Sequence, residues 1–351
     1  MIELLSGLQK PIIIQGGMGI NISLSGLAAA VANEGGIGVI SAAGLGFEER
    51  ADSNYFNANI KALEREIRKA RELTRGVLGV NVMLALSNFP DLVKTCIKEK
   101  ADIIFVGAGM TLDLPKYLLA GSKTKLAVIV SSARAARLIC QKWLNRFNYL
   151  PDAIVVEGPK AGGHLGFSIE ELSNPLFALE KLVIEVVNEV KAFAHQKKIP
   201  IIAAGGIYTG ADIKKILDLG AAGVQMATRF VTTHECDADI RFKQAYIDAR
   251  KEDIIIIKSP VGMPGRAIRN KFLDEVSEGA RKPIGCVCKC IRTCDVVNSP
   301  YCIVRALVNA KNGNFDEGFA FAGSNAYLAK KIISVKELMA TLRNEYAKAC
   351  S

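Results

Sequence analysis

Eight short apolar segments recur along the chain, and each ends in glycine, asparagine or a small polar residue. They are rich in valine, isoleucine and alanine with little alternation, a pattern typical of parallel strands covered by helices. The predicted strands are 11–15, 37–41, 77–83, 103–106, 126–131, 153–157, 201–204 and 223–227. Eight repeats of strand, loop and helix predict a (β/α)8 TIM barrel of the α/β class.

Amphipathic segments lie between most of these strands and predict helices. They are 23–33, 90–98, 133–147, 175–196 and 211–219, with an inserted helix in the charged segment 47–75 and an eighth helix at 237–251. After Phe230 the pattern changes, with a further predicted strand at 254–258 and a final helix at 335–349. We therefore divide the chain into a barrel, residues 1–254, and a cysteine-rich C-terminal extension, residues 255–351.

Length and composition fit this division. The 351 residues exceed the roughly 250 that a barrel needs, and half of them are apolar. The net charge of +10 raises the question of nucleic acid, but the basic residues of helical segments such as 61–75 alternate with glutamate. We interpret them as solvated helix faces and expect no nucleic-acid partner.

The chain has no evident export or membrane signal. Met1–Leu5 lacks a basic region followed by an apolar one, and no apolar stretch approaches the roughly 20 residues of a membrane span. Nine cysteines in such a chain are expected to be reduced thiols or metal ligands. We expect a cytoplasmic protein with no membrane partner, and the apolar extension permits a homodimer.

The ends of the last two predicted strands carry a pattern that suits a phosphate. Gly205 and Gly206 follow the seventh strand, and Ala227 and Thr228 follow the eighth. Free backbone N–H groups, a hydroxyl and a helix N-terminus can together bind a phosphate, and TIM barrels commonly do so at these two loops. With a histidine on the preceding loop, the pattern suggests an enzyme that uses flavin mononucleotide (FMN).

Two further segments could face the ring of such a cofactor. Gly17 would let the backbone approach a planar ligand and Met18 could lie against its face, although a turn at the barrel rim would also use glycine. Asn81 lies in an otherwise apolar strand, where its carboxamide needs both a donor and an acceptor. A flavin edge offers both, and a hydrogen-bonded core asparagine is the alternative.

His164 is the candidate catalytic residue. It is one of three histidines and follows Gly162 and Gly163 at the end of the sixth strand, where its imidazole could enter the barrel mouth. Its ordinary pKa near neutrality suits proton transfer. The alternative is a histidine that only caps this loop, and Glu157 could orient the loop or close the barrel rim.

These motifs together resemble the nitronate monooxygenase (2-nitropropane dioxygenase) family of FMN-dependent barrels, a close relative of flavin-dependent enoyl-acyl carrier protein reductase II. The resemblance covers about 5–275 and includes 265–270, which is similar to a segment of the reductases. It implies that His164 is the catalytic acid or base. The implied cofactor-binding residues, with neighbours that we add from the same loops, are Gly17, Met18, Asn81, Glu157, Gly162, Gly163, Gly205, Gly206, Ala227 and Thr228.

The resemblance leaves more than one activity open. The first expectation is oxidation of alkyl nitronates by O2 to a carbonyl compound and nitrite. The second is reduction of an enoyl thioester by NAD(P)H, because Ile129 stands where a nitronate branch has a flavin-contacting lysine. A flavin- or metal-binding redox sensor is a minor alternative. An inosine monophosphate dehydrogenase is disfavoured because 158–166 contains no cysteine.

The C-terminal extension carries five cysteines within seventeen residues. Their spacing matches neither a zinc ribbon nor a ferredoxin, and small core-filling thiols are the alternative. We nevertheless expect a metal or iron–sulfur site there. Its predicted ligands are Cys286, Cys290, Cys294 and Cys302.

Overall fold

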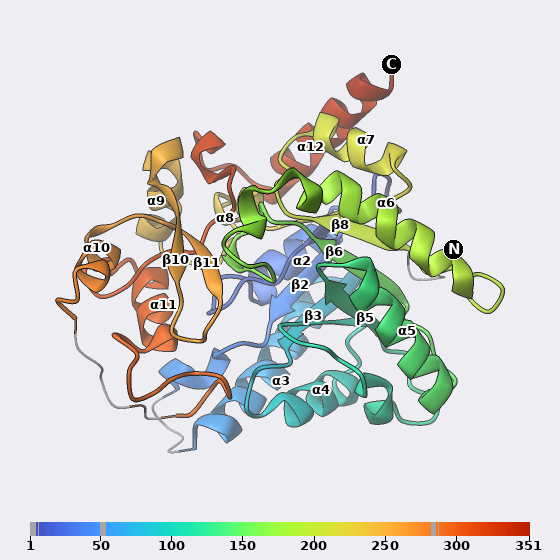
Figure 1. Ribbon diagram of the computed structural model, residues 1–351, viewed down its shortest axis with the longest axis horizontal. Helices are drawn as coiled ribbons and strands as arrows, with labels where there is room; N and C mark the ends of the chain where they lie inside the picture. The colour runs from blue at the N-terminus through green and yellow to red at the C-terminus, as the bar shows by residue number, and fades with distance from the viewer. Residues whose placement is uncertain (1–4, 6, 50–53, 282–285, 287) are drawn as a thin grey trace.

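The computed structural model of this protein describes residues 5, 7–49, 54–281, 286 and 288–351 (Figure 1). Eight parallel strands close into a barrel in the order β1-β2-β3-β4-β5-β6-β8-β9. These are β1 (Ile13–Gln15), β2 (Ile37–Ser41), β3 (Val77–Met83), β4 (Ile103–Gly107), β5 (Lys125–Val130), β6 (Ala153–Glu157), β8 (Ile201–Ala204) and β9 (Gly223–Met226). The predicted TIM barrel is confirmed.

The barrel is held by apolar packing on both sides of its strands. Phe105, Val155 and Ile202 fill its interior, while alternate strand residues pack against the helices outside. The pairing of β1 with β2 extends over the fewest residues in the barrel, and a side chain adds hydrogen bonds to it. Gln15 accepts from the Val39 N–H at 3.0 Å and donates to the Val39 carbonyl at 3.2 Å.

Helices surround the strands as the repeat predicts (Figure 1). They are α2 (Ser25–Asn33), α3 (Tyr55–Leu73), α4 (Phe89–Lys98), α5 (Ala133–Phe147), α6 (Leu179–Val190) and α7 (Gly210–Asp218). The long helix expected within 47–75 is α3, which connects β2 to β3; residues 50–53 of that segment lie outside the described residues. Only a short 3-10 turn, η2 (Leu114–Tyr117), connects β4 to β5.

Two helix predictions need correction. The helix predicted at 175–196 is interrupted, because Pro175 begins a 3-10 turn and Ala178 has an extended ψ of 140°, so that α6 begins at Leu179. The helix predicted at 237–251 is α9 (Ile240–Asp248), and it does not complete the outer ring.

The outer position between α7 and α2 is filled instead by α12 (Val335–Cys350), which contacts both helices (Figure 1). Leu338, Met339 and Leu342 of α12 are fully buried in the main core. The helix directly after β9 is only four residues long, α8 (Thr228–Val231). The last helix of the chain therefore completes the outer ring of helices, because the segment 237–251 packs elsewhere.

The C-terminal extension is joined to the barrel through a small antiparallel sheet. Its order is β10-β11-β7, with β10 (Ile254–Lys258), β11 (Pro264–Ile268) and β7 (Gly163–His164). The extension also contains α10 (Lys271–Ser277) and α11 (Ile303–Lys311), packed on a second apolar cluster. Because β7 belongs to the loop after β6, the extension directly contacts the predicted site. The domain boundary at residue 254 stays a prediction.

No helix within the described ranges combines the length and the apolar character needed to cross a bilayer. The prediction that Met1–Leu5 carries no export signal concerns residues of which 1–4 lie outside the described part of the chain.

Candidate active site

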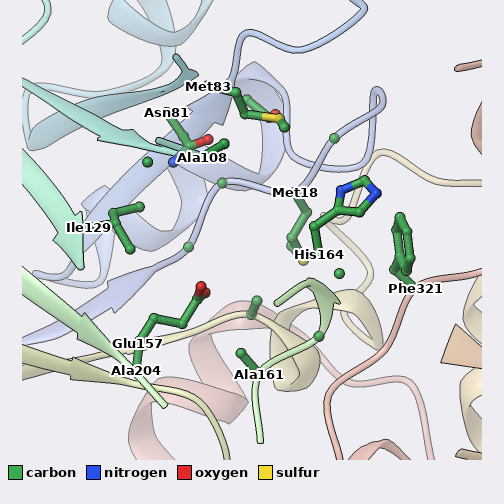
Figure 2. Close-up of a pocket in the computed structure, with 18 of the residues that line it drawn as sticks. Met18, Asn81, Met83, Ala108, Ile129, Glu157, Ala161, His164, Ala204 and Phe321 are labelled. Carbon is green, nitrogen blue, oxygen red and sulfur yellow. The ribbon is translucent and has the colours of Figure 1, made fainter. Parts of the chain in front are cut away.

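A cavity of about 590 Å³ opens at the C-terminal ends of the barrel strands. This volume lies within the range of small-molecule and cofactor sites. Its walls come from the loops after nearly every strand and from four segments of the C-terminal extension, at Met263, Ile291, 303–307 and 321–323. Figure 2 shows Asn81, Ile129, Glu157 and His164 directed toward this space from different strands. The position is the one where TIM barrels carry their active sites.

One end of the cavity is lined by tightly packed backbone. Gly205 has φ of +97°, and a Cβ there would lie 2.9 Å from the Gly158 carbonyl oxygen. The Gly323 N–H donates to Thr228 Oγ1 at 3.2 Å, and a Cβ on Gly323 would lie 2.6 Å from the same oxygen. Asn325 fixes the neighbouring loop by donating to the Gly206 carbonyl at 2.7 Å. A small anion fits where side chains are excluded in this way.

The other end of the cavity offers flat and polar surfaces. Gly17 lies so close to Asn81 that a Cβ on Gly17 would be 2.4 Å from the Asn81 Cβ. The Met18 N–H donates to Ser23 Oγ at 2.8 Å, which fixes the loop after β1. Met18 and Asn81 both line the cavity (Figure 2). A ring system could therefore lie on this loop with its edge at the Asn81 carboxamide.

His164 is held by the C-terminal extension. Its Nε2 lies 2.7 Å from the Oγ of buried Ser259, and its backbone pairs with Gly265 of β11. The ring of Phe321 meets it edge-on, with 4.9 Å between centroids (Figure 2). Burial lowers the pKa of His164 to about 4. The imidazole is therefore neutral near pH 7.

Arg266 holds the loop that carries His164. This buried β11 residue donates to the carbonyl of Pro159 at 2.7 Å and to that of Ala161. Burial lowers the pKa of the guanidinium from its ordinary value. A charged donor placed on two carbonyls makes stronger hydrogen bonds than a neutral one. The extension thus fixes both the backbone and the side chain of the loop after β6.

Glu157 is a carboxyl group with a shifted pKa at the cavity wall. It ends β6, and Figure 2 shows its side chain directed into the cavity. Desolvation by burial raises its pKa from 4.5 to about 7. Both of its protonation states are therefore populated near neutral pH. A group of this kind can hold or release a proton beside a bound ligand.

A family model for nitronate monooxygenase matches residues 3–94 and 87–345, which is nearly the whole chain. The chain belongs to the nitronate monooxygenase family. The match includes both the barrel and most of the C-terminal extension, so the segments that line the cavity all lie within it.

This family member is similar to proteins of two functional classes, CoA-ester dehydrogenases and a probable nitronate monooxygenase. It is 29% identical over 280 residues to an octahydroindene-carboxyl-CoA dehydrogenase of Mycobacterium tuberculosis, covering 79% of this chain and 68% of that protein. The Rhodococcus jostii counterpart is 29% identical over 272 residues, covering 78% and 66%. The chain thus spans about two thirds of the length of these two dehydrogenases. A probable nitronate monooxygenase of Staphylococcus aureus is 28% identical over 309 residues, covering 76% and 77%.

Solved structures share the fold of this family member over nearly its whole length. FabK from Thermotoga maritima aligns with a TM-score of 0.74 at 27% identity, covering 99% of this chain and 96% of that one. A nitroalkane oxidase from Streptomyces ansochromogenes aligns with a TM-score of 0.76 at 23% identity, covering 99% of each chain. The second likeness concerns the fold alone.

The structure brings the sequence-predicted site residues of this family member together in one cavity. Gly17, Met18, Asn81, Glu157, Gly162, Gly163, His164, Gly205, Gly206, Ala227 and Thr228 all line it. Their roles toward a cofactor stay predictions. The glycines, a hydroxyl and a carboxamide in this arrangement fit the phosphate and ring of FMN, since the two ends of the cavity differ as such a ligand requires.

Four functional positions were missed by the sequence analysis. They are Ser259, Arg266, Phe321 and Gly323, all in the C-terminal extension. Arg266 lies in the segment 265–270 that resembles the reductases, and this resemblance was the available signal. The other three lie at least 95 positions after the residues that they contact, and no local pattern predicts that they return to the barrel mouth.

The predicted metal-binding cysteines lie outside this cavity. Cys286, Cys290, Cys294 and Cys302 line a separate cavity of about 360 Å³. Among the described residues, no group of three or more His, Cys, Asp or Glu side chains is arranged to hold a single metal ion. The expectation of a metal site is therefore wrong for a single ion, because no three ligand side chains of the described part of the chain are grouped to hold one.

Proposed function

We propose that this family member is an FMN-dependent oxidoreductase. The cavity supports this proposal, because glycines that exclude side chains line one end and a carboxamide and a thioether line the other. Gly205, Gly206 and Thr228 would hold the phosphate, and Met18 and Asn81 the ring. When bound, FMN supplies the redox chemistry, since none of these side chains can accept a pair of electrons.

We propose oxidation of alkyl nitronates as the reaction. The observation that carries this proposal is the place of His164, which lines the cavity between Ser259 and Phe321 and whose pKa burial lowers to about 4. A nitronate has already lost its α-proton, so it needs a hydrogen-bond donor and not a strong base. His164 Nε2 lies 2.7 Å from Ser259 Oγ, so one ring nitrogen is already paired with the protein. With Ser259 as the donor of this bond, the proton of the neutral ring is on Nδ1, where it would be donated to the anion.

A second candidate is the reduction of an enoyl thioester. Ile129, which lines the cavity from β5, leaves no lysine at a position where the nitronate branch is expected to have one. FabK, an enoyl-acyl carrier protein reductase II, aligns over nearly the whole chain, and the Mycobacterium relative acts on a CoA ester. This reaction needs a proton donor near the substrate. Glu157, with a pKa of about 7, can hold that proton at neutral pH.

Anaerobic mixing of the FMN-loaded protein with each reductant separates the two reactions. Loss of the flavin's visible absorbance with an alkyl nitronate, and none with NADH or NADPH, supports nitronate oxidation. Rapid loss with NADH or NADPH contradicts it and supports thioester reduction. Reduction by neither, with FMN bound, overturns both in favour of a redox sensor. Failure to bind FMN overturns the flavin proposal itself.

We also expect a cytoplasmic protein that can form a homodimer. Cell fractionation tests the location, and light scattering of the purified chain tests the oligomeric state.

A further inference from the structure

The second cavity has a wall of thiols. Cys286, Cys290, Cys294 and Cys302 line its 360 Å³, and Cys288 touches two of them through hydrogen bonds to the Cys286 and Cys290 thiols. All five are free thiols, and Cys290 is almost fully buried. The thiols do not lie together only because they are close in sequence: Cys302 comes from the start of α11, and the others come from the preceding loop.

The polar surroundings of the cavity suit a negatively charged occupant. Lys289 and Arg292 line it, and the Lys289 N–H donates to Cys286 Sγ at 3.2 Å. Cys302 occupies the N-cap of the nine-residue helix α11, whose first backbone N–H groups have no partners within the helix. Cationic side chains and N–H groups of this kind stabilise thiolates and the clusters that thiolates bind.

An independent observation also indicates a missing occupant. Tyr301 lines the same cavity, its side chain is 5% exposed, and its hydroxyl has no hydrogen-bond partner within the described part of the chain. A buried hydroxyl without a partner costs about 1 to 3 kcal/mol. A core of small apolar thiols would not supply that partner. A polar or sulfide-bearing group in the cavity would.

The size of the cavity distinguishes between possible occupants. A structural zinc ion draws four ligands to within roughly 2.3 Å of one point and leaves no cavity. Here the cavity far exceeds the roughly 15 Å³ that suffices for one water molecule, and no set of ligands among the described residues is grouped around a single ion. Four thiols that line a cavity of this size instead leave room for a cluster of several metal atoms bridged by sulfide.

We propose that Cys286, Cys290, Cys294 and Cys302 bind an iron–sulfur cluster. The site is fixed to the barrel, because Ser87 N–H donates to the Cys290 carbonyl at 3.0 Å and Leu86 pairs with Ile291. It also adjoins the first cavity, since Ile291 and Ile303 line both. One layer of side chains therefore separates the cluster from the space assigned to FMN. The proposal of cluster binding does not depend on which flavin reaction takes place.

The test is metal and sulfide analysis of the full chain, purified anaerobically and then reconstituted with ferrous iron and sulfide. The proposal predicts more than one iron per chain with an equal amount of acid-labile sulfide, and a paramagnetic signal in one redox state. One zinc per chain without sulfide would overturn it. So would a chain that retains no iron after reconstitution, or that forms disulfides between these cysteines.

Variants locate the ligands. Cys294→Ser and Cys302→Ser should each lower the iron content by about tenfold or more, because changing even an outer-shell partner of a metal ligand typically costs about 10- to 100-fold in metal affinity. The exposed Cys350→Ser is the matched control and should keep the iron of the unmodified chain. Equal iron loss in all three variants would overturn the ligand assignment, with FMN uptake and melting temperature as the checks on folding.

Discussion

The barrel mouth and the cysteine-lined cavity lie side by side but are built differently. In the mouth, Glu157 and the glycines after β8 stand at the ends of barrel strands, so the register of the parallel barrel fixes their place, and β11 of the extension fixes His164. In the cysteine-lined cavity, all the thiols except that of Cys302 stand on a loop, which backbone contacts and the side chains of Ser87 and Arg292 connect to the barrel. A site on strand ends is positioned by the fold, whereas a site on a loop depends on what the loop binds.

The two regions also differ in their charges. The mouth holds a neutral histidine and a half-ionised Glu157, whose pKa values are shifted by burial. The cysteine-lined cavity holds cationic side chains beside its thiols. The mouth is therefore suited to controlling a proton, and the second cavity to holding a negative group. Changes at the mouth should affect FMN and turnover without affecting iron, and the reverse should hold for the cysteines.

The largest effect is expected from Gly205→Val. The new side chain would require a β-branched residue at φ of +97° and would place its Cβ 2.9 Å from the Gly158 carbonyl oxygen. If relief of this strain displaces the loop from its FMN-binding position at a cost of about 3 kcal/mol, FMN affinity falls roughly a hundredfold. Fluorescence titration with FMN measures it.

Gly121→Val is the matched control, because Gly121 also has positive φ, +79°, but its Cβ would have no neighbour within 4 Å. Equal losses of FMN affinity in both variants would show a general folding defect and would contradict a phosphate site at Gly205.

His164→Ala should separate binding from turnover. FMN uptake should change less than threefold, while turnover should fall by about 10- to 100-fold, the effect of removing one hydrogen bond to a charged group. His195→Ala removes an exposed histidine and should leave turnover unchanged. Ser259→Ala should cause a smaller loss than His164→Ala, because it only releases Nε2. Full activity of His164→Ala would remove the residue from the mechanism.

Arg266→Met tests whether the extension holds the mouth. Two carbonyls would lose their charged donor, which costs about 2 to 3 kcal/mol, so the melting temperature and the FMN affinity should both fall. Arg269→Met is the control, since Arg269 is exposed and pairs only with Asp274 among the contacts described. Loss of stability with unchanged FMN affinity would mean that β11 does not position the site.

The smallest effect concerns Glu157 and pH. The folded protein keeps Glu157 protonated to higher pH than the unfolded chain does, so its burial destabilises the fold increasingly as pH rises from about 4.5 to about 7. Over this interval the free energy of unfolding should fall by about 1 to 2 kcal/mol less in Glu157→Gln than in the unmodified protein. Urea unfolding at both ends of the interval measures it. The exposed Glu278→Gln should leave the loss as it is.

The sequence predicts the strands well because each parallel strand is a continuous apolar segment ended by a glycine or a polar residue. The same feature predicts Gly205, Thr228 and His164, since their places follow from the strand ends. It cannot predict that α12 fills the outer ring or that Ser259 meets His164. Those contacts depend on packing between residues far apart in the chain, and no local periodicity records it.

A crystal structure of the protein soaked with FMN tests the central claim most directly. The account predicts the phosphate between the loops that carry Gly206 and Thr228, with the ring edge at Asn81 and the ring within reach of His164. A phosphate bound elsewhere, or a cavity that takes up no flavin at saturating concentration, would contradict it.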